Sequence, residues 1–236
     1  MFRSLALVAA LAAPALALAQ AAAPAPRPGV DFEVISPAQA TFGPPGKIEV
    51  AEVFSYHCPA CADFQPFISR WKARAPADVR VTYVHAAFGG AIDNLARGFF
   101  AAEALGATDR VHVGVFRAFH IERKITTGSI DEVANVYAGL GFDRKKMLDT
   151  MNSFGVTSKV NRAKQFAQRT GANSTPTVIV NGKYRVNATR EGGWEGMLRT
   201  IDVLVARERA ATRPAAARPA AARPAPAPRP AAAPAR

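Results

Sequence analysis

The fold of this chain is decided by residues 47–61, which read KIEVAEVFSYHCPAC. The first part, Lys47–Ser55, is mostly apolar and rich in β-branched and aromatic residues, which predicts a strand that enters a core. The second part ends in two cysteines, Cys58 and Cys61, and apolar residues then recur at helical spacing over Ala62–Ala75. The stretch therefore predicts a strand, a cysteine pair and a helix in direct succession.

The position of the two cysteines suits redox chemistry. A thiol attacks only as a thiolate, and a free cysteine is mostly protonated at neutral pH. Where a strand ends and a helix begins, unpaired backbone N–H groups and the positive end of the helix dipole stabilise such an anion. Pro59 fits the first helical turn, because the N–H that it lacks would be unpaired there. We expect Cys58 to be the exposed, attacking sulfur and Cys61, three residues on, the more buried partner.

Other uses of a CxxC pair fit the sequence less well. Half a zinc site has the same form, but the 236 residues hold only these two cysteines, and the four histidines are scattered at positions 57, 85, 112 and 120. A c-type haem site needs a histidine after Cys61, where Ala62 stands. A disulfide that closes so short a loop removes little chain entropy. We therefore predict redox chemistry with no metal and no cofactor.

The rest of the chain predicts a mixed α/β fold. A second strand is expected at Val79–Ala87, a helical block from Ala91 to Arg169, a hairpin at Thr177–Val186 and a last helix at Gly193–Arg209. The crossover between the first two strands requires a parallel pair and the hairpin an antiparallel one, so we expect four strands in one mixed sheet. Pro66 predicts a kink or a break in the first helix.

Both ends of the chain differ from the middle. Residues 1–19 have a basic start, a short apolar run and an Ala17-Leu18-Ala19 ending, which predicts a secretory signal peptide. Residues 20–31 read as an Ala/Pro linker, and residues 210–236 as a disordered Ala/Pro/Arg tail. Residues 207–236 hold seven arginines and one acid, so half of the net charge of +12 lies there. Because no basic groove interleaved with aromatic residues appears elsewhere, we expect no nucleic-acid partner.

Two distant motifs together resemble one family. Residues 54–61 (FSYHCPAC) and 174–184 (STPTVIVNGKY) are similar to those of the DsbA family of periplasmic thiol:disulfide interchange proteins, and the similarity covers roughly residues 32–208. The resemblance implies a thioredoxin fold with an all-helical domain inserted into it. The thioredoxin part would comprise residues 32–90 and 158–209, and the insertion residues 91–157.

The resemblance also implies roles for single residues. Cys58 would be the nucleophile, Cys61 the resolving thiol and Pro176 a cis-proline that faces them. Thr175 would offer backbone hydrogen bonds to an extended substrate, which could pair with the edge that a proline leaves free. The remaining positions expected to contact substrate are His57, Pro59 and Ala60.

One acid and one substitution set this sequence apart. Glu52 matches the buried acid of the family, whose raised pKa would let it shuttle the proton of Cys61, whereas Glu49 is expected to face solvent. The family often pairs this acid with a lysine on the next strand, and Val81–Val84 supplies none. The residue before the second cysteine is commonly histidine in the family and is Ala60 here. We therefore expect a higher pKa of Cys58 and a weaker oxidant than in relatives with that histidine.

The expected function is an enzyme of the periplasm that introduces disulfides into reduced exported polypeptides. A DsbB-like, quinone-linked membrane oxidase would reoxidise it. A disulfide reductase or isomerase on the same fold is the first alternative, and residues 20–46 are too short and Pro-rich for the dimerisation domain that such isomerases usually carry, which favours a monomer. A metal- or peptide-binding module is the second alternative, and a Pro176 far from Cys58 would support it.

Overall fold

The computed structural model describes residues 24–212. The predicted signal peptide (1–19) lies outside the described residues, as do part of the predicted linker and residues 213–236 of the predicted tail. Across residues 24–212, no helix combines the length and the apolar character that crossing a bilayer requires.

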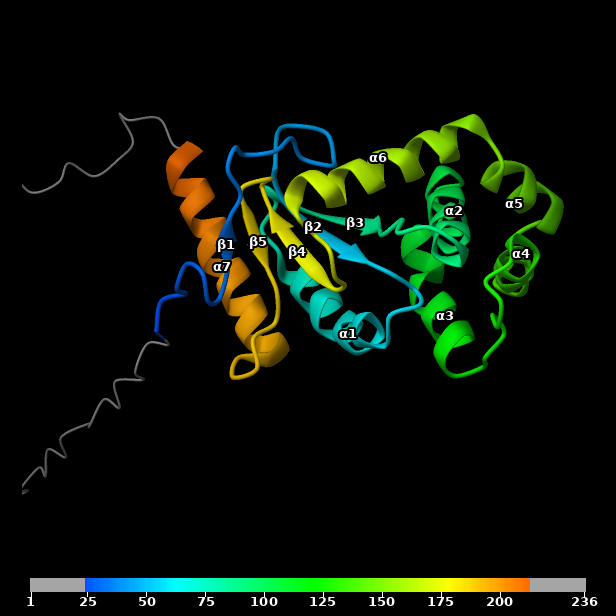
Figure 1. Cartoon of the computed structure of the whole chain (residues 1–236), viewed down its shortest axis with the longest axis horizontal. Helices are drawn as coiled ribbons and strands as arrows, with labels where there is room; N and C mark the ends of the chain where they lie inside the picture. The colour runs from blue at the N-terminus through cyan, green and yellow to red at the C-terminus, as the bar shows by residue number, and fades with distance from the viewer. Residues whose placement is uncertain (1–23, 213–236) are drawn as a thin grey trace, which may run out of the picture.

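From β2 onward, strands and helices follow one another in the order that the sequence predicts (Figure 1). The elements are β1 (Glu33–Val34), β2 (Ile48–Phe54), α1 (Pro59–Arg74), β3 (Val79–His85), α2 (Ala91–Ala104), α3 (Thr108–His120), α4 (Ile130–Gly139), α5 (Arg144–Met151), α6 (Phe154–Thr170), β4 (Thr177–Val180), β5 (Tyr184–Val186) and α7 (Gly193–Thr212). The predicted boundary at 157/158 falls inside α6, and the one at 209/210 falls inside α7.

One mixed sheet forms the centre, with the strand order β1-β5-β4-β2-β3. As predicted, β2 and β3 are parallel, and β4 pairs antiparallel with both β2 and β5. The prediction of four strands is wrong by one: β1 adds a fifth strand at the edge, with Glu33 opposite Arg185. A strand of two residues is too short to show the alternation by which strands are recognised.

The sheet separates two apolar clusters. One contains Val50 and Val178 with Ile68 of α1 and Ile201 of α7. The other contains Val53 with side chains of α2, α3 and α6. Figure 1 shows α1 and α7 near one another beside the sheet, and α2 to α5 gathered at the end of the molecule away from α7. The thioredoxin fold with a helical insertion is thereby confirmed.

Two local predictions need correction. Of the kink or break predicted at Pro66, the break does not occur, since α1 runs from Pro59 to Arg74. Buried side chains on both sides of the proline, Phe64 before it and Ile68 after it, hold both halves in the same core.

Glu49 does not face solvent but is 1% exposed. Its carboxylate accepts hydrogen bonds from the backbone N–H groups of Phe42 and Gly43 and from the hydroxyl of Thr82. The loop before β2 folds back over this acid, and a strand pattern alone gives no sign of that contact.

The turn between β4 and β5 depends on glycine. Asn181 and Gly182 have φ values of 50° and 68°, and Lys183 N–H donates to the carbonyl of Val180 at 3.0 Å. A Cβ added to Gly182 would overlap the backbone oxygen of Gln39. The predicted hairpin turn therefore also packs against the loop that precedes β2.

We predict that Gly182→Ala lowers the free energy of unfolding by about 2–4 kcal/mol, because it combines a left-handed backbone with overpacking against a neighbouring chain. Gly139→Ala is the matched control: it lies in α4 with open space around it, and should raise stability by up to about 1 kcal/mol. Urea unfolding of both variants checks this, and equal effects of the two substitutions would contradict it.

Candidate active site

Cys58 lies at the point where the chain leaves β2 and enters α1. It is the N-cap residue of α1, and its sulfur accepts a hydrogen bond from Cys61 N–H at 3.4 Å. Pro59 occupies the first turn, as expected, and the N–H of Cys58 donates to the carbonyl of Ser55 at 3.0 Å. The sulfur of Cys58 thus stands where the free N–H groups of the helix converge.

The two thiols, which are free in this structure, differ in environment. Cys58 is half-buried and Cys61 is fully buried. The pKa of Cys58 is lowered to about 5, chiefly by a hydrogen bond from the Cys61 side chain. A hydrogen bond from the Thr175 side chain and the backbone N–H groups of Cys61 and Ala60 lower it further, against the burial that raises it. The same pairing with Cys58, together with burial, raises the pKa of Cys61 far above its ordinary value.

A second segment reaches this sulfur from far along the chain. The Thr175–Pro176 peptide bond is cis and leads directly into β4. The Cys58 thiol lies 3.2 Å from the carbonyl oxygen of Thr175, to which it donates. The fold therefore brings Cys58, Thr175 and Pro176 together across 117 residues of sequence.

Asn187 supports this segment, and sequence reasoning missed it. Its side-chain amide donates to the hydroxyl of Thr177 at 2.7 Å and to the carbonyl of Pro176 at 3.4 Å. An asparagine just after a strand reads as an ordinary turn residue, so the sequence carries no signal for this contact.

Glu52 lies in the middle of the sheet, on β2 between β3 and β4. It is 1% exposed, and neither of its carboxylate oxygens has a hydrogen-bond partner among residues 24–212. Burial, followed by the negative charge on Cys58, raises its pKa to about 8. The residue opposite Glu52 on β3 is Tyr83, whose own pKa is raised to about 12, first by burial and then by Glu52. At neutral pH this carboxyl group therefore holds its proton.

His57, which precedes Cys58, and Ala60, which follows Pro59, have different surroundings. His57 is exposed, and its ring packs edge-on against Phe119 of α3, with ring centroids 5.5 Å apart. Ala60 is half-buried and has only its backbone N–H to offer the sulfur.

Three histidines that are scattered in the sequence meet around Tyr56, just before the cysteine motif. The Tyr56 hydroxyl hydrogen-bonds His112 at 2.8 Å, its N–H donates to His85 at 3.2 Å, and its carbonyl accepts from His120 at 2.9 Å. Burial lowers the pKa of both His85 and His112 to about 3, so these two are neutral. Because His112 and His120 belong to α3, the helical segment holds the turn that carries Cys58.

Comparison with known proteins gives a consistent result. Residues 43–202 match the thioredoxin family model. The chain is 38% identical over 212 residues to the thiol:disulfide interchange protein DsbA of Pseudomonas aeruginosa, which covers 89% of this chain and 99% of that protein. It is 33% identical over 177 residues to the protein of the same name from Burkholderia cepacia, covering 75% and 83%. The crystal structure of the oxidoreductase DsbA from Xylella fastidiosa has a TM-score of 0.73 and 39% identity, and covers 78% of this chain and 98% of that one.

The buried acid leads to a prediction of pH dependence. Because the pKa of Glu52 is higher in the folded chain than its ordinary value of 4.5, folding favours the protonated form, and stability is lost as the pH rises through about 8. Glu52→Gln keeps the shape of that form without the ionisation. The free energy of unfolding of the variant should match that of the wild type near pH 5 and exceed it by on the order of 4 kcal/mol at pH 9.

Urea unfolding between pH 5 and pH 9 measures this difference. Glu195→Gln, at an exposed position on α7, serves as the control for loss of one negative charge. A difference between Glu52→Gln and the wild type that does not grow with pH would show that Glu52 ionises freely.

Proposed function

Since this chain belongs to the DsbA family of thiol:disulfide interchange proteins and is a thiol–disulfide oxidoreductase, we propose that it oxidises dithiols through Cys58 and Cys61. The observation that carries this is the difference in pKa between the two thiols, about 5 for Cys58 and far above the ordinary value for Cys61. A sulfur that is stable as an anion is a good leaving group, so a disulfide that contains it is readily transferred to a substrate dithiol.

The reaction proceeds in two exchanges. In the oxidised enzyme, a substrate thiolate attacks the sulfur of Cys58, a substrate–Cys58 disulfide forms, and Cys61 leaves with the electron pair. A second substrate thiolate then attacks the substrate sulfur of this mixed disulfide, and Cys58 leaves as a thiolate. The substrate has lost two electrons and two protons, and the enzyme has gained both electrons.

Glu52 is the acid that we assign to the first exchange. Cys61 cannot persist as an anion, because burial and its neighbour raise its pKa far above neutral. Glu52 lies in the same buried region and is protonated below about pH 8, so it can supply the proton that Cys61 takes up. In the reverse, reoxidising direction the ionised Glu52 would accept that proton.

Thr175 and Pro176 form the surface on which the substrate backbone is held. Only the protonated Cys58 thiol can donate to the Thr175 carbonyl. The thiolate, which prevails above a pKa of about 5, and a Cys58 joined to substrate both lack that proton, so the carbonyl is free to accept an N–H from an extended substrate. His57, Pro59 and Ala60 flank the sulfur and complete this surface, with the His57 ring packed against Phe119. The contact between Cys58 and Thr175 places a carbonyl and a proline beside the thiols, and this disfavours a metal site.

The setting follows from the kind of reaction. We place the enzyme in the periplasm, as a monomer, with reduced exported polypeptides as substrates and a DsbB-like, quinone-linked membrane oxidase as the source of oxidant. Residues 1–19, where a signal peptide is predicted, support export. A reductase or isomerase role on the same fold would need a more reducing disulfide.

Two measurements on the full chain test the oxidase role. Cys61→Ser cannot resolve a mixed disulfide, so it should accumulate covalent complexes with a partly oxidised substrate protein, which dithiothreitol cleaves, whereas Cys58→Ser should form none. The Cys58–Cys61 couple, equilibrated in glutathione buffers, should be more oxidising than thioredoxin, which lies at about −270 mV. A potential at or below that value would favour the reductase, and complexes with Cys58→Ser would remove Cys58 as the nucleophile.

A further inference from the structure

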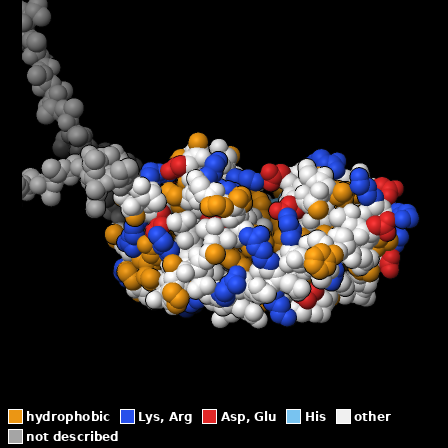
Figure 2. Space-filling view, turned by 90° about the horizontal axis from the view of Figure 1, so that it is seen from above, with side chains coloured by type: hydrophobic (Ala, Val, Ile, Leu, Met, Phe, Trp, Pro, Cys, Tyr) orange, Lys and Arg blue, Asp and Glu red, His pale blue; other side chains and the backbone are white. Residues whose placement is uncertain are grey.

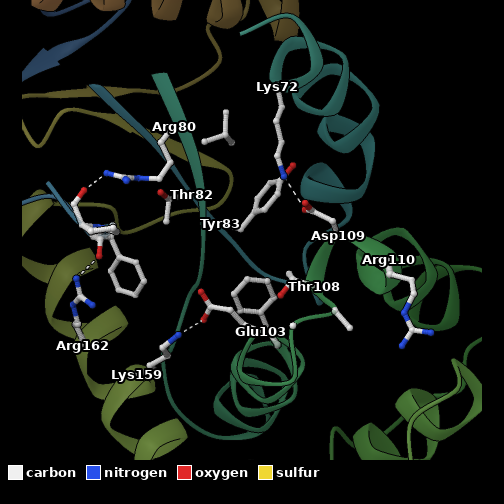
Figure 3. Close-up of a pocket in the computed structure, with 17 residues that line it drawn as sticks. Lys72, Arg80, Thr82, Tyr83, Glu103, Thr108, Asp109, Arg110, Lys159 and Arg162 are labelled. Atoms are coloured by element: carbon white, nitrogen blue, oxygen red, sulfur yellow. Dashed lines mark hydrogen bonds and ion pairs between the residues drawn. The ribbon is translucent and has the colours of Figure 1, made fainter. Parts of the chain in front are cut away.

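A groove that takes no part in the redox site lies along the outer edge of β3. It has a volume of about 670 Å³ and is bounded by β3, by the loop at Phe42–Pro44 and by α2, α3 and α6. Figure 3 shows Arg80, Thr82 and Tyr83 of β3 on one side, with Lys159 and Arg162 of α6 below them. None of its lining residues belongs to the cysteine motif or to the Thr175–Pro176 segment.

The lining of this groove shows that it follows the backbone of β3. Four consecutive residues of the strand, Arg80 to Tyr83, contact it. Successive side chains of a strand point to opposite faces, so a cavity that reaches all four must run along the strand's edge. Among residues 24–212, β3 is the last strand of the sheet and pairs with β2 alone. An edge of this kind presents unpaired N–H and C=O groups, which are a template for a further strand.

The charges around the groove are mostly positive. Its basic residues are Lys72, Arg80, Arg110, Lys159 and Arg162. Its two acids are already paired: Asp109 with Lys72 at 2.7 Å, and Glu103 with Lys159 at 2.6 Å.

Two of the three arginines rest against aromatic rings, which leave their charge uncompensated. Arg110 lies over the ring of Phe142, and Arg162 over the ring of Phe42. Arg80 donates to the carbonyl of Pro44, while its Nε is buried with no hydrogen-bond partner among the described residues. Glu49 lies near Arg80 and keeps its negative charge, because the donors that bond its oxygens, two backbone N–H groups and Thr82, are neutral. Counted with it, the five basic residues of the groove still outnumber the acids. Seen from above, the described part of the chain also shows more Lys and Arg than Asp and Glu near the middle of that face (Figure 2).

We propose that this groove, termed the β3 groove, binds an extended acidic peptide segment of a client or partner protein, by adding it as a strand to β3. The backbone of the segment pairs with the open edge over Arg80–Tyr83, which at 3.3 Å per residue accommodates about four to six residues. Its acidic side chains meet Arg80, Arg110 and Arg162. The site does not depend on the thiols, so it would hold a polypeptide while another part of it reacts at Cys58.

The test uses the full chain and a fluorescent, cysteine-free heptapeptide of alternating glutamate and valine. Two matched peptides accompany it: one with glutamine in place of glutamate, and one with alternate backbone nitrogens methylated. The acidic peptide should bind, and each matched peptide should bind at least tenfold more weakly, because the first lacks the charge and the second cannot pair as a strand. Equal binding of the methylated peptide would overturn strand addition, and equal binding of the glutamine peptide would overturn the role of charge.

Variants locate the site. The double variant Arg110→Glu/Arg162→Glu should weaken binding of the acidic peptide at least tenfold. Arg169→Glu, at an exposed position on α6, the helix that carries Arg162, should change its binding less than twofold. Oxidation of dithiothreitol should be unchanged in both, since none of these residues lies at the redox site. NMR shift mapping on the unmodified chain gives the same answer without variants: shifts over Arg80–Tyr83 support the β3 groove, and shifts confined to the Thr175–Pro176 segment overturn it.

Discussion

The negative charge on one sulfur is the feature on which the rest of this molecule depends. Cys58 ends the loop after β2 and begins α1, so that the Cys61 side chain and the N–H groups of Ala60 and Cys61 converge on its sulfur. The same contacts that make Cys58 acidic make Cys61 hard to ionise, because the two thiols share one hydrogen bond. A disulfide between two sulfurs so unlike one another is held in a fold that favours its reduced state, and this is the property that an oxidant of dithiols needs.

The residues around the thiols support this arrangement, and one of them lowers the stability of the fold. Glu52 is buried without a hydrogen-bond partner among the described residues, which destabilises the fold whenever it ionises and keeps a proton close to Cys61 at neutral pH. The turn before Cys58 is fixed on three sides through Tyr56, by His85 of β3 and by His112 and His120 of α3. The helical segment therefore does more than cover the sheet: it holds the loop from which the reactive sulfur projects.

Much of this could be predicted from sequence, for reasons that differ between elements. The strand Ile48–Phe54 and the hairpin at Asn181–Gly182 have strong local patterns, and the structure places them within a residue or two of the prediction. The meeting of Cys58 with Thr175 is invisible in local patterns and follows only from the family resemblance. The burial of Glu49 and the histidine cluster around Tyr56 could not be predicted, because both depend on contacts between segments far apart in the chain, and no spacing rule encodes them.

The acidity of Cys58 is the central claim, and the pH dependence of its alkylation tests it most directly. In the reduced full chain, the rate of iodoacetamide reaction at Cys58, followed by mass spectrometry, should rise with pH around a midpoint near 5, while Cys61 stays unreactive across the range. A midpoint near 9, the value of an ordinary thiol, would contradict the account and leave the oxidase role without its physical basis.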